Sequence, residues 1–212
     1  MAGASKAANK PTRGEITRRK ILDAAEEVFA EQSYAAARLE DVAQRVGIKR
    51  AAIVYYFRDK QELFDAVESG LYAALEAAIR SRLETATTHL DRLFALIDSS
   101  LDFLVERPSL AKLILRNIAD SYPAASDPVR YSQSILRFWE EIVAAGQASG
   151  EFGPVDTMHV MQILGGSTLY FATTAELLGQ DKQYNVTDPE VLNEFRAILH
   201  KTGESLLKPT AQ

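Results

Sequence analysis

The sequence predicts an all-α protein, and three observations support this fold class. Apolar residues recur at three- and four-residue steps over most of the chain, whereas convincing strand-like alternation is lacking. The 212 residues include only 7 prolines and 11 glycines, so few positions interrupt a helix. Hydrophobic residues make up 47% of the chain and charged residues 25%, which is typical of a soluble protein with a buried core.

The stretch from residue 39 to residue 57 is the most informative part of the sequence. Residues 39–46 carry apolar side chains on one helical face, and Gly47 follows where the backbone has to turn. A second short helix is expected over about residues 50–57. Ala43 lies four residues before Gly47 and is small enough to let the two helices cross closely. This spacing is typical of a helix-turn-helix motif, whose second helix enters the DNA major groove.

Basic and aromatic side chains on this second helix are suited to phosphates and base edges. The next helix begins near Lys60, and a helix N-terminus favours an anion. The candidate DNA-contact residues are therefore Arg18, Arg38, Lys49, Arg50, Ala51, Tyr55, Tyr56 and Lys60. The same spacing also fits an ordinary helical hairpin whose charges are only solvated, because a fold does not imply a function.

The region from about Arg18 to Val67 resembles the DNA-binding domain of the tetracycline-repressor (TetR) family of bacterial transcription regulators. The resemblance extends over a three-helix pattern in register: residues 21–31, the motif at 39–57, and residues 58–64. Three positions depart from it, because a tyrosine, a threonine and a glycine are common in the family where this sequence has Val54, Arg38 and Ser33. The resemblance implies a homodimer that binds double-stranded operator DNA and responds to a small molecule.

Charge is divided unevenly along the chain. Residues 1–60 carry 12 Lys and Arg against 8 Asp and Glu, whereas residues 61–212 carry 12 against 21. The net charge of −5 therefore hides a basic N-terminal part, which suits a protein whose N-terminal end alone approaches DNA.

The predicted organisation has three parts. Residues 1–12 form a disordered arm without the apolar run of a signal peptide. Residues 13–60 form the helix-turn-helix DNA-binding domain, and residues 61–212 form a helical effector-binding and dimerisation domain. A helix that starts at residue 60 links the two domains. Further helices are expected over about 90–106, 109–122, 127–148, 155–178 and 189–207, with Asp127-Pro128 and Asp188-Pro189 as start signals.

The least charged segment, residues 158–178, is interrupted by polar residues and glycines, so we do not expect it to cross a membrane. Its apolar residues extend around most of the helix. It is expected to pack on the core and, together with the last helix, on a second copy of the chain across a two-fold axis. The architecture of the TetR family implies the same dimer.

Catalytic and metal-binding constellations are not found. The three histidines are isolated, phosphate-binding glycine loops are lacking, and the chain contains no cysteine. We expect neither an enzyme nor a cofactor or metal, and the absence of cysteine is compatible with the cytoplasm.

The resemblance implies a cavity for a mainly hydrophobic effector. Our candidates for its lining are Phe103, Leu104, Leu113, Asn117, Phe138, Trp139, Met158, Met161, Gln162, Tyr170 and Phe171. The alternative interpretation is that these residues are packed core. The sequence thus predicts a cytoplasmic, ligand-responsive repressor, and a helical protein–protein adaptor without sequence-specific DNA binding is the alternative.

Overall fold

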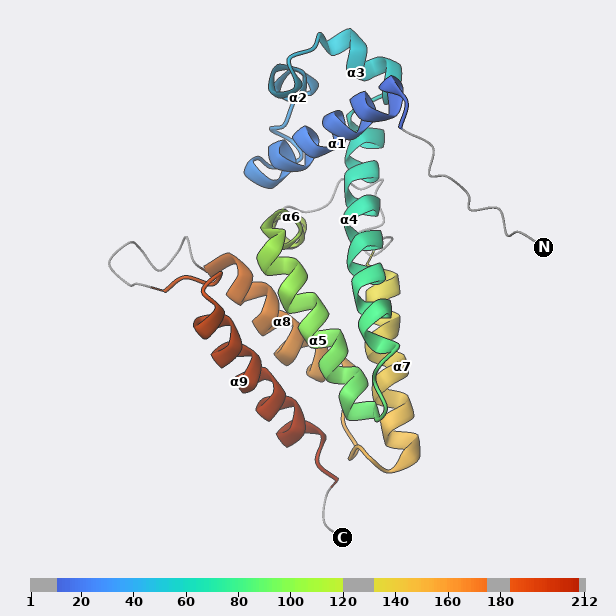
Figure 1. Ribbon diagram of the computed structural model, residues 1–212, viewed down its shortest axis with the longest axis vertical. Coiled ribbons are helices and arrows are strands. Elements are labelled where there is room, and N and C mark those ends of the chain that lie inside the picture. The colour runs from blue at the N-terminus through green and yellow to red at the C-terminus, as the bar shows by residue number, and fades with distance from the viewer. Residues whose placement is uncertain (1–10, 120–131, 175–183, 210–212) are drawn as a thin grey trace, which may run out of the picture. The chain divides into compact units, whose positions relative to one another are not determined.

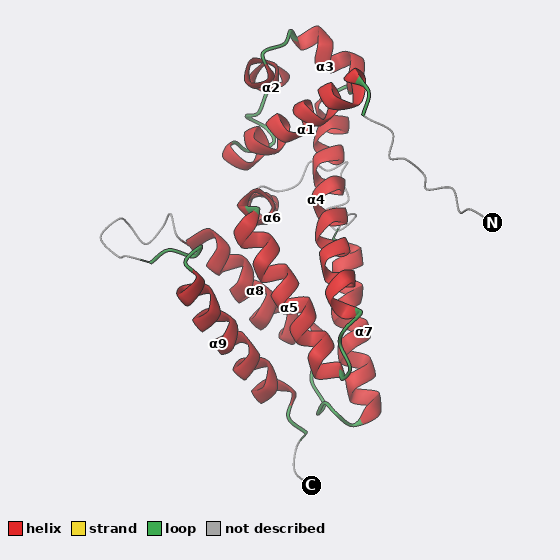
Figure 2. Cartoon of the chain, in the orientation of Figure 1, coloured by secondary structure: helices red, strands yellow, loops and turns green. Residues whose placement is uncertain are grey.

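The computed structural model describes residues 11–119, 132–174 and 184–209. Within them it contains nine α-helices and no strand, which confirms the all-α prediction (Figures 1 and 2). The helices are α1 (Arg13–Glu31), α2 (Leu39–Val46), α3 (Arg50–Tyr56), α4 (Lys60–Leu83), α5 (His89–Glu106), α6 (Pro108–Ala119), α7 (Gln133–Ser149), α8 (Thr157–Thr174) and α9 (Pro189–Leu207).

The chain divides into two compact units, which meet within α4 between Val67 and Glu68. We call them the N-terminal unit (to Val67) and the C-terminal unit (from Glu68). The boundary expected from the sequence lay after residue 60, so the N-terminal unit also includes the first two turns of α4.

Local signals in the sequence account for several helix ends. The Thr12 hydroxyl accepts a hydrogen bond from the Glu15 N–H at 3.2 Å, and the Glu15 carboxylate accepts one from the Thr12 N–H at 2.7 Å. Thr12, the last residue that we assigned to the arm, is therefore the N-cap of α1. Asp188 caps α9 as expected, with Pro189 in its first turn. Residues 1–10 and the start signal at Asp127-Pro128 lie outside the described residues.

Helix α5 forms the centre of the C-terminal unit and packs against α6, α7, α8 and α9 (Figure 1). Its Leu93, Leu96 and Leu101 are fully buried, as are Val160 and Leu164 of α8. Burial of side chains of this size contributes roughly 1.5–3 kcal/mol each, so the hydrophobic effect sets the packing of this unit.

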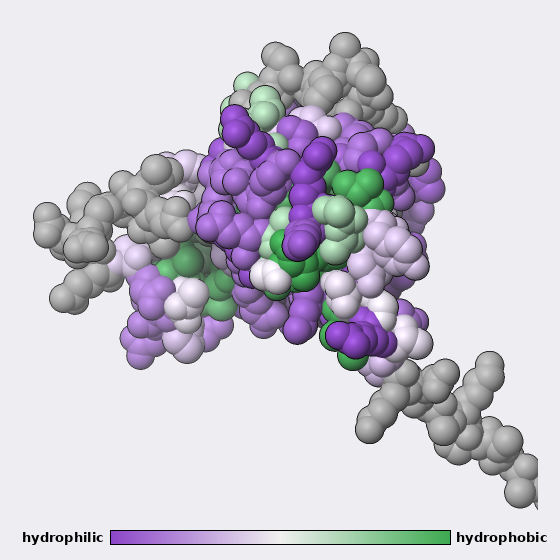
Figure 3. Space-filling view, turned by 90° about the horizontal axis from the view of Figure 1, so that it is seen from above, coloured by the Kyte–Doolittle hydropathy of each residue, from purple (hydrophilic) through white to green (hydrophobic). Residues whose placement is uncertain are grey.

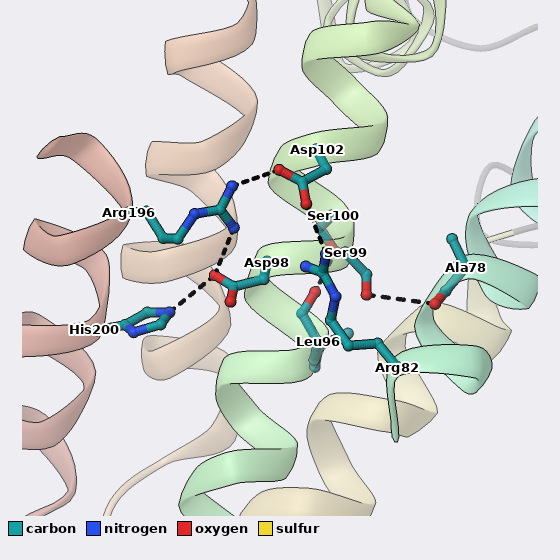
Figure 4. A network of polar contacts seen from close by, with 9 residues as sticks. All are labelled: Ala78, Arg82, Leu96, Asp98, Ser99, Ser100, Asp102, Arg196 and His200. Carbon is teal, nitrogen blue, oxygen red and sulfur yellow. Dashed lines mark hydrogen bonds and ion pairs between the residues drawn. The ribbon is translucent and has the colours of Figure 1, made fainter. Parts of the chain in front are cut away.

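A network of ion pairs joins α9 to α5 (Figure 4). The Arg196 guanidinium lies 2.9 Å from the Asp98 carboxylate and also pairs with Asp102. His200, one turn further along α9, places its Nε2 2.8 Å from the same Asp98 oxygen. Arg82 at the end of α4 reaches Asp102 at 2.9 Å. Sequence reasoning treated His200 as isolated, because its partner Asp98 lies 102 positions away along the chain.

Candidate nucleic-acid interface

The turn between α2 and α3 has the geometry that the motif requires. Gly47 has φ 75° and ψ 34°, a left-handed conformation that side chains with a Cβ rarely adopt. The N–H of Ile48 donates to the carbonyl oxygen of Ala43 at 3.0 Å, which satisfies a free carbonyl at the end of α2. Ala43 itself is buried, as its small size predicted.

Helix α3 has one buried side and one exposed side. Ile53 and the following Phe57 are buried in the core of the N-terminal unit. In contrast, the Tyr55 side chain is 82% exposed and Val54 is 44% exposed. Arg50 and Ala51, in the first turn, are also exposed. The buried residues therefore hold a short helix whose outer side carries cationic, aromatic and small side chains.

Charged and aromatic contacts hold together the helices that support α3. Arg45 of α2 pairs with Glu27 at 2.9 Å and with Glu31, and both acids belong to α1. The Phe64 ring packs edge-on against Phe29 with ring centroids 5.0 Å apart. Arg45 is thus neutralised within the unit, so its charge serves the fold rather than the outer surface.

The remaining expected contact residues lie at different places in the N-terminal unit. Lys49 precedes α3 as its N-cap and is exposed. Tyr56 is half-buried, and its ring lies edge-on to that of Tyr55 with centroids 5.1 Å apart. Arg18 of α1 is exposed and places its guanidinium 4.9 Å from the centre of the Phe57 ring. Arg38 is the N-cap of α2 and is also exposed.

Lys60 has partners that the sequence did not predict. Its ammonium donates to the carbonyl oxygens of Tyr34 at 2.6 Å and Ala37 at 3.0 Å, and lies 4.4 Å from the centre of the Tyr34 ring. Burial lowers the pKa of Lys60. These contacts hold the loop between α1 and α2, so they differ from the phosphate contact that we expected.

Carboxylates occupy the N-terminus of α4, where we expected an anion to bind. Asp59 accepts a hydrogen bond from the Glu62 N–H at 2.8 Å, and Glu62 accepts one from the Arg58 N–H at 2.8 Å. The backbone hydrogen bond from Glu62, followed by the contact with Arg58, lowers the pKa of Asp59. The protein therefore supplies its own negative charge at this helix end.

Hydrophilic side chains dominate the face of the molecule shown in Figure 3, with a smaller hydrophobic area among them. In the described part of the N-terminal unit, the large apolar side chains that remain exposed are Ile16, Val54 and Tyr55. Two of these three belong to α3, which combines apolar and aromatic contact area with the charges of Lys49 and Arg50.

A separate cavity of about 440 Å³ lies within the C-terminal unit. Five of the expected ligand-contact residues line it: Leu104, Trp139, Met158, Met161 and Gln162. The described lining contains no charged side chain. Burial, reinforced by the Glu68 carboxylate, raises the pKa of the Tyr72 hydroxyl in its wall, so this group is neutral.

Other expected ligand residues lie elsewhere. Tyr170 and Phe171 line a second cavity of about 620 Å³ beside α9, and Gln162 and Gly166 line both cavities. Asn117 donates to the Glu68 carboxylate, and Phe138 is buried beneath Arg80, whose guanidinium lies 5.0 Å from the centre of its ring. Phe103 is half-buried in α5 and Leu113 is buried in α6.

Sequence reasoning missed most of the small and polar residues of the 440 Å³ cavity. The additional lining residues are Tyr72, Leu75, Ser100, Ile114, Ser132, Ile135, Leu136, Gly165, Gly166, Thr168 and Leu169. The two adjacent glycines were a usable signal, because a Cβ added at Gly166 would meet no atom within 4 Å. A Cβ added at Gly165, in contrast, would lie 3.4 Å from the Trp139 ring, so this glycine is in close contact with α7.

Comparison with known proteins agrees with this geometry. Residues 21–67 match the model of the bacterial regulatory proteins of the tetR family, and this range covers α1 from Ile21 onward, α2, α3 and the start of α4. This chain therefore carries the DNA-binding region of the tetR family.

The tetR-family relatives include transcription regulators from several bacteria. The transcriptional activator FasR of Mycolicibacterium smegmatis is 30% identical over 129 residues, which span 61% of this chain and 58% of FasR. The transcriptional regulator RutR of Escherichia coli K12 is 24% identical over 175 residues, which span 82% of both chains.

Solved structures of tetR-family and related regulators share the fold. A tetR-family protein from Rhodococcus RHA1 superposes with a TM-score of 0.73 at 16% identity, covering 95% of this chain and 100% of its own. The regulator FadR of Bacillus subtilis, solved with stearoyl-CoA, superposes with a TM-score of 0.69 at 18% identity, covering 90% of this chain and 99% of FadR. Within the residues that the structure describes, no helix combines the length and apolar character needed to cross a membrane.

Proposed function

We propose that this tetR-family protein is a repressor that binds a palindromic DNA operator as a homodimer and leaves it when a small hydrophobic effector binds. One observation supports DNA binding most directly: α3 is anchored by Ile53 and Phe57 while Arg50, Ala51 and Tyr55 remain on its exposed side. A helix presented in this way fits the major groove, where arginine reads guanine and apolar groups contact the thymine methyl.

The dimer is supported by apolar side chains that one copy of the chain leaves exposed on α8 and α9. Ile163 is 42% exposed, Tyr170 61% and Ile198 60%. A second copy would bury them in a self-complementary interface between two pairs of helices. Two equivalent copies of α3 related by a two-fold axis then match the two halves of a palindrome.

The effector is proposed to occupy the 440 Å³ cavity of the C-terminal unit. The uncharged lining favours a neutral, mainly apolar molecule, and Gln162 and Tyr72 offer it hydrogen bonds. Two structural neighbours have titles that name ligands with large apolar parts: the ketosteroid transcriptional regulator KstR2 of Mycobacterium tuberculosis and the FadR solved with stearoyl-CoA, whose acyl chain is apolar. An effector weakens DNA binding only by its differential affinity for the two states of the protein.

A mobility-shift titration with the duplex that flanks the protein's own gene tests the proposal. We expect a retarded band at lower protein concentration than with a scrambled duplex of equal length, and a loss of binding as salt rises. Light scattering of the complex should give two chains per duplex. Equal affinity for both duplexes would refute the repressor and would favour the protein–protein adaptor.

A further inference from the structure

A carboxylate lies beside the arginine that α3 presents to solvent. The Glu40 Oε1 atom is 3.0 Å from the Arg50 Nε atom, and the pair joins the first turn of α2 to the first turn of α3. The two side chains remain 59% and 61% exposed. An exposed pair of this kind contributes little to stability, so stability gives little reason for its presence.

Capping of α2 does not explain Glu40 either. Its neighbour Asp41 accepts the hydrogen bond from the Arg38 N–H at 3.1 Å and so serves the helix N-terminus. Acidic residues in a first turn also interact favourably with the helix dipole, but Asp41 already provides that charge. The Glu40 carboxylate instead lies across the turn beside α3.

The contact involves the inner nitrogen of the guanidinium. Nε lies on the stem side of the group, so an ion pair there restrains the side chain while the two terminal nitrogens point beyond it. Those nitrogens carry four of the five N–H donors of an arginine. A bidentate contact with guanine O6 and N7 needs two parallel donors of this fork.

We propose that Glu40 is a positioning residue that orients the Arg50 guanidinium for reading a guanine. This inference rests on the proposed function, because it requires α3 to face base edges. Glu40 also repels the phosphates of any DNA, and only a duplex that engages Arg50 productively compensates for this repulsion. Such a carboxylate increases specificity at the expense of general affinity.

Selection from a pool of duplexes with a randomised core first identifies the preferred site, and single base replacements then give the guanine preference of each variant. The variants are Glu40→Ala, Arg50→Ala and the double substitution. Asp23→Ala is the matched control, because it removes an exposed carboxylate from α1 of the same unit. Fluorescence anisotropy measures affinity for the selected duplex, its guanine-replaced form and a random duplex.

We expect Glu40→Ala to reduce discrimination at one guanine per half-site about tenfold, while affinity for random duplex does not fall. A merely structural role would weaken binding to all three duplexes together. In the Arg50→Ala background the additional effect of Glu40→Ala should vanish, because a positioning residue acts through its partner. Asp23→Ala should leave discrimination unchanged.

Three results would overturn the inference while the proposed function stands. These are unchanged discrimination in Glu40→Ala, an equal loss in Asp23→Ala, or a Glu40 effect that persists without Arg50. The last result would mean that Glu40 contacts a base itself, as a carboxylate does with the cytosine amino group. If the wild-type protein selects no sequence, the proposed function fails, and this inference fails with it.

Discussion

The ammonium of Lys60 donates a hydrogen bond to the carbonyl oxygen of Tyr34 at 2.6 Å, across 26 positions of the chain. Together with its contacts to Ala35 and Ala37, this bond satisfies the carbonyls of the loop that precedes α2. The position of α2, and with it that of α3, thus depends on a lysine that the sequence alone predicts to contact DNA.

Lys60→Ala should lower the free energy of unfolding of the N-terminal unit by about 1–2 kcal/mol, because part-buried carbonyls lose a charged donor. Chemical denaturation followed by circular dichroism measures the change. Lys49→Ala removes an exposed cation from the same unit and should change stability by less than about 0.5 kcal/mol. Lys60→Ala could instead remain as stable as the wild type while the slope of log affinity against log salt concentration falls by about one unit. This result would indicate a phosphate contact.

Gly47→Ala should destabilise the N-terminal unit by about 1–2 kcal/mol, because a Cβ is disfavoured at a φ of 75°. Gly14→Ala is the control: its Cβ would lie 3.9 Å from the Tyr56 hydroxyl, an ordinary contact, within the helix α1. In thermal unfolding, Gly47→Ala should have a clearly lower melting temperature than Gly14→Ala. Equal melting temperatures would mean that the turn does not require the left-handed conformation.

Glu15→Ala should lower the melting temperature near neutral pH and have no effect in acid. The backbone N–H of Thr12, and next its hydroxyl, lower the pKa of the Glu15 carboxyl in the folded protein. A lowered pKa gives stability above the unfolded value of about 4.3 that is lost as pH falls through the folded value. Melting curves from neutral pH to below about pH 4 should therefore converge for the two proteins. A constant difference at all pH values would contradict the charged cap.

Arg196→Ala should loosen α9, because Asp98 and Asp102 lose their shared partner in a part-buried site. We expect a loss of about 1–3 kcal/mol and faster hydrogen exchange of the α9 amides. Lys201→Ala, an exposed change on the same helix, should leave both quantities nearly unchanged. Unaltered exchange in Arg196→Ala would mean that apolar packing alone holds α9.

Gly166→Leu should narrow both cavities of the C-terminal unit, since this glycine lines each of them and the space next to it is open. A neutral apolar fluorophore such as N-phenyl-1-naphthylamine should bind the wild type with enhanced emission and should not bind the variant. Gly70→Leu, on the exposed side of α4, provides the matched control. Equal binding by all three proteins would place the probe outside both cavities.

The sequence predicted those features that depend on neighbours in the chain. The turn at Gly47, the buried Ala43 and the start of α9 at Asp188 all follow from local backbone preferences. The same reasoning could have identified Thr12 as the N-cap of α1, because Thr12 and Glu15 have the spacing of a capping box. We assigned Thr12 to the arm on composition alone.

Features that need the folded chain could not be predicted in this way. The role of Lys60 depends on carbonyls some 25 positions away, and His200 meets Asp98 across 102 positions. The cavity is lined by parts of five helices. Their apolar character made Trp139 and Met161 candidates for its lining, but the same criterion also selected Phe138, which is packed in the core. Helical periodicity indicates which side of its own helix a residue occupies. Whether that side borders a cavity depends on the helices that pack against it.

The most direct test of the central claim is a titration of the gene-flanking duplex and a scrambled duplex with the wild type, Arg50→Ala and Tyr55→Ala. If α3 reads DNA, each substitution should reduce the affinity for the flanking duplex by about 1–3 kcal/mol while the scrambled duplex loses less. If both variants bind the two duplexes as the wild type does, the exposed side of α3 is not the surface that recognises DNA.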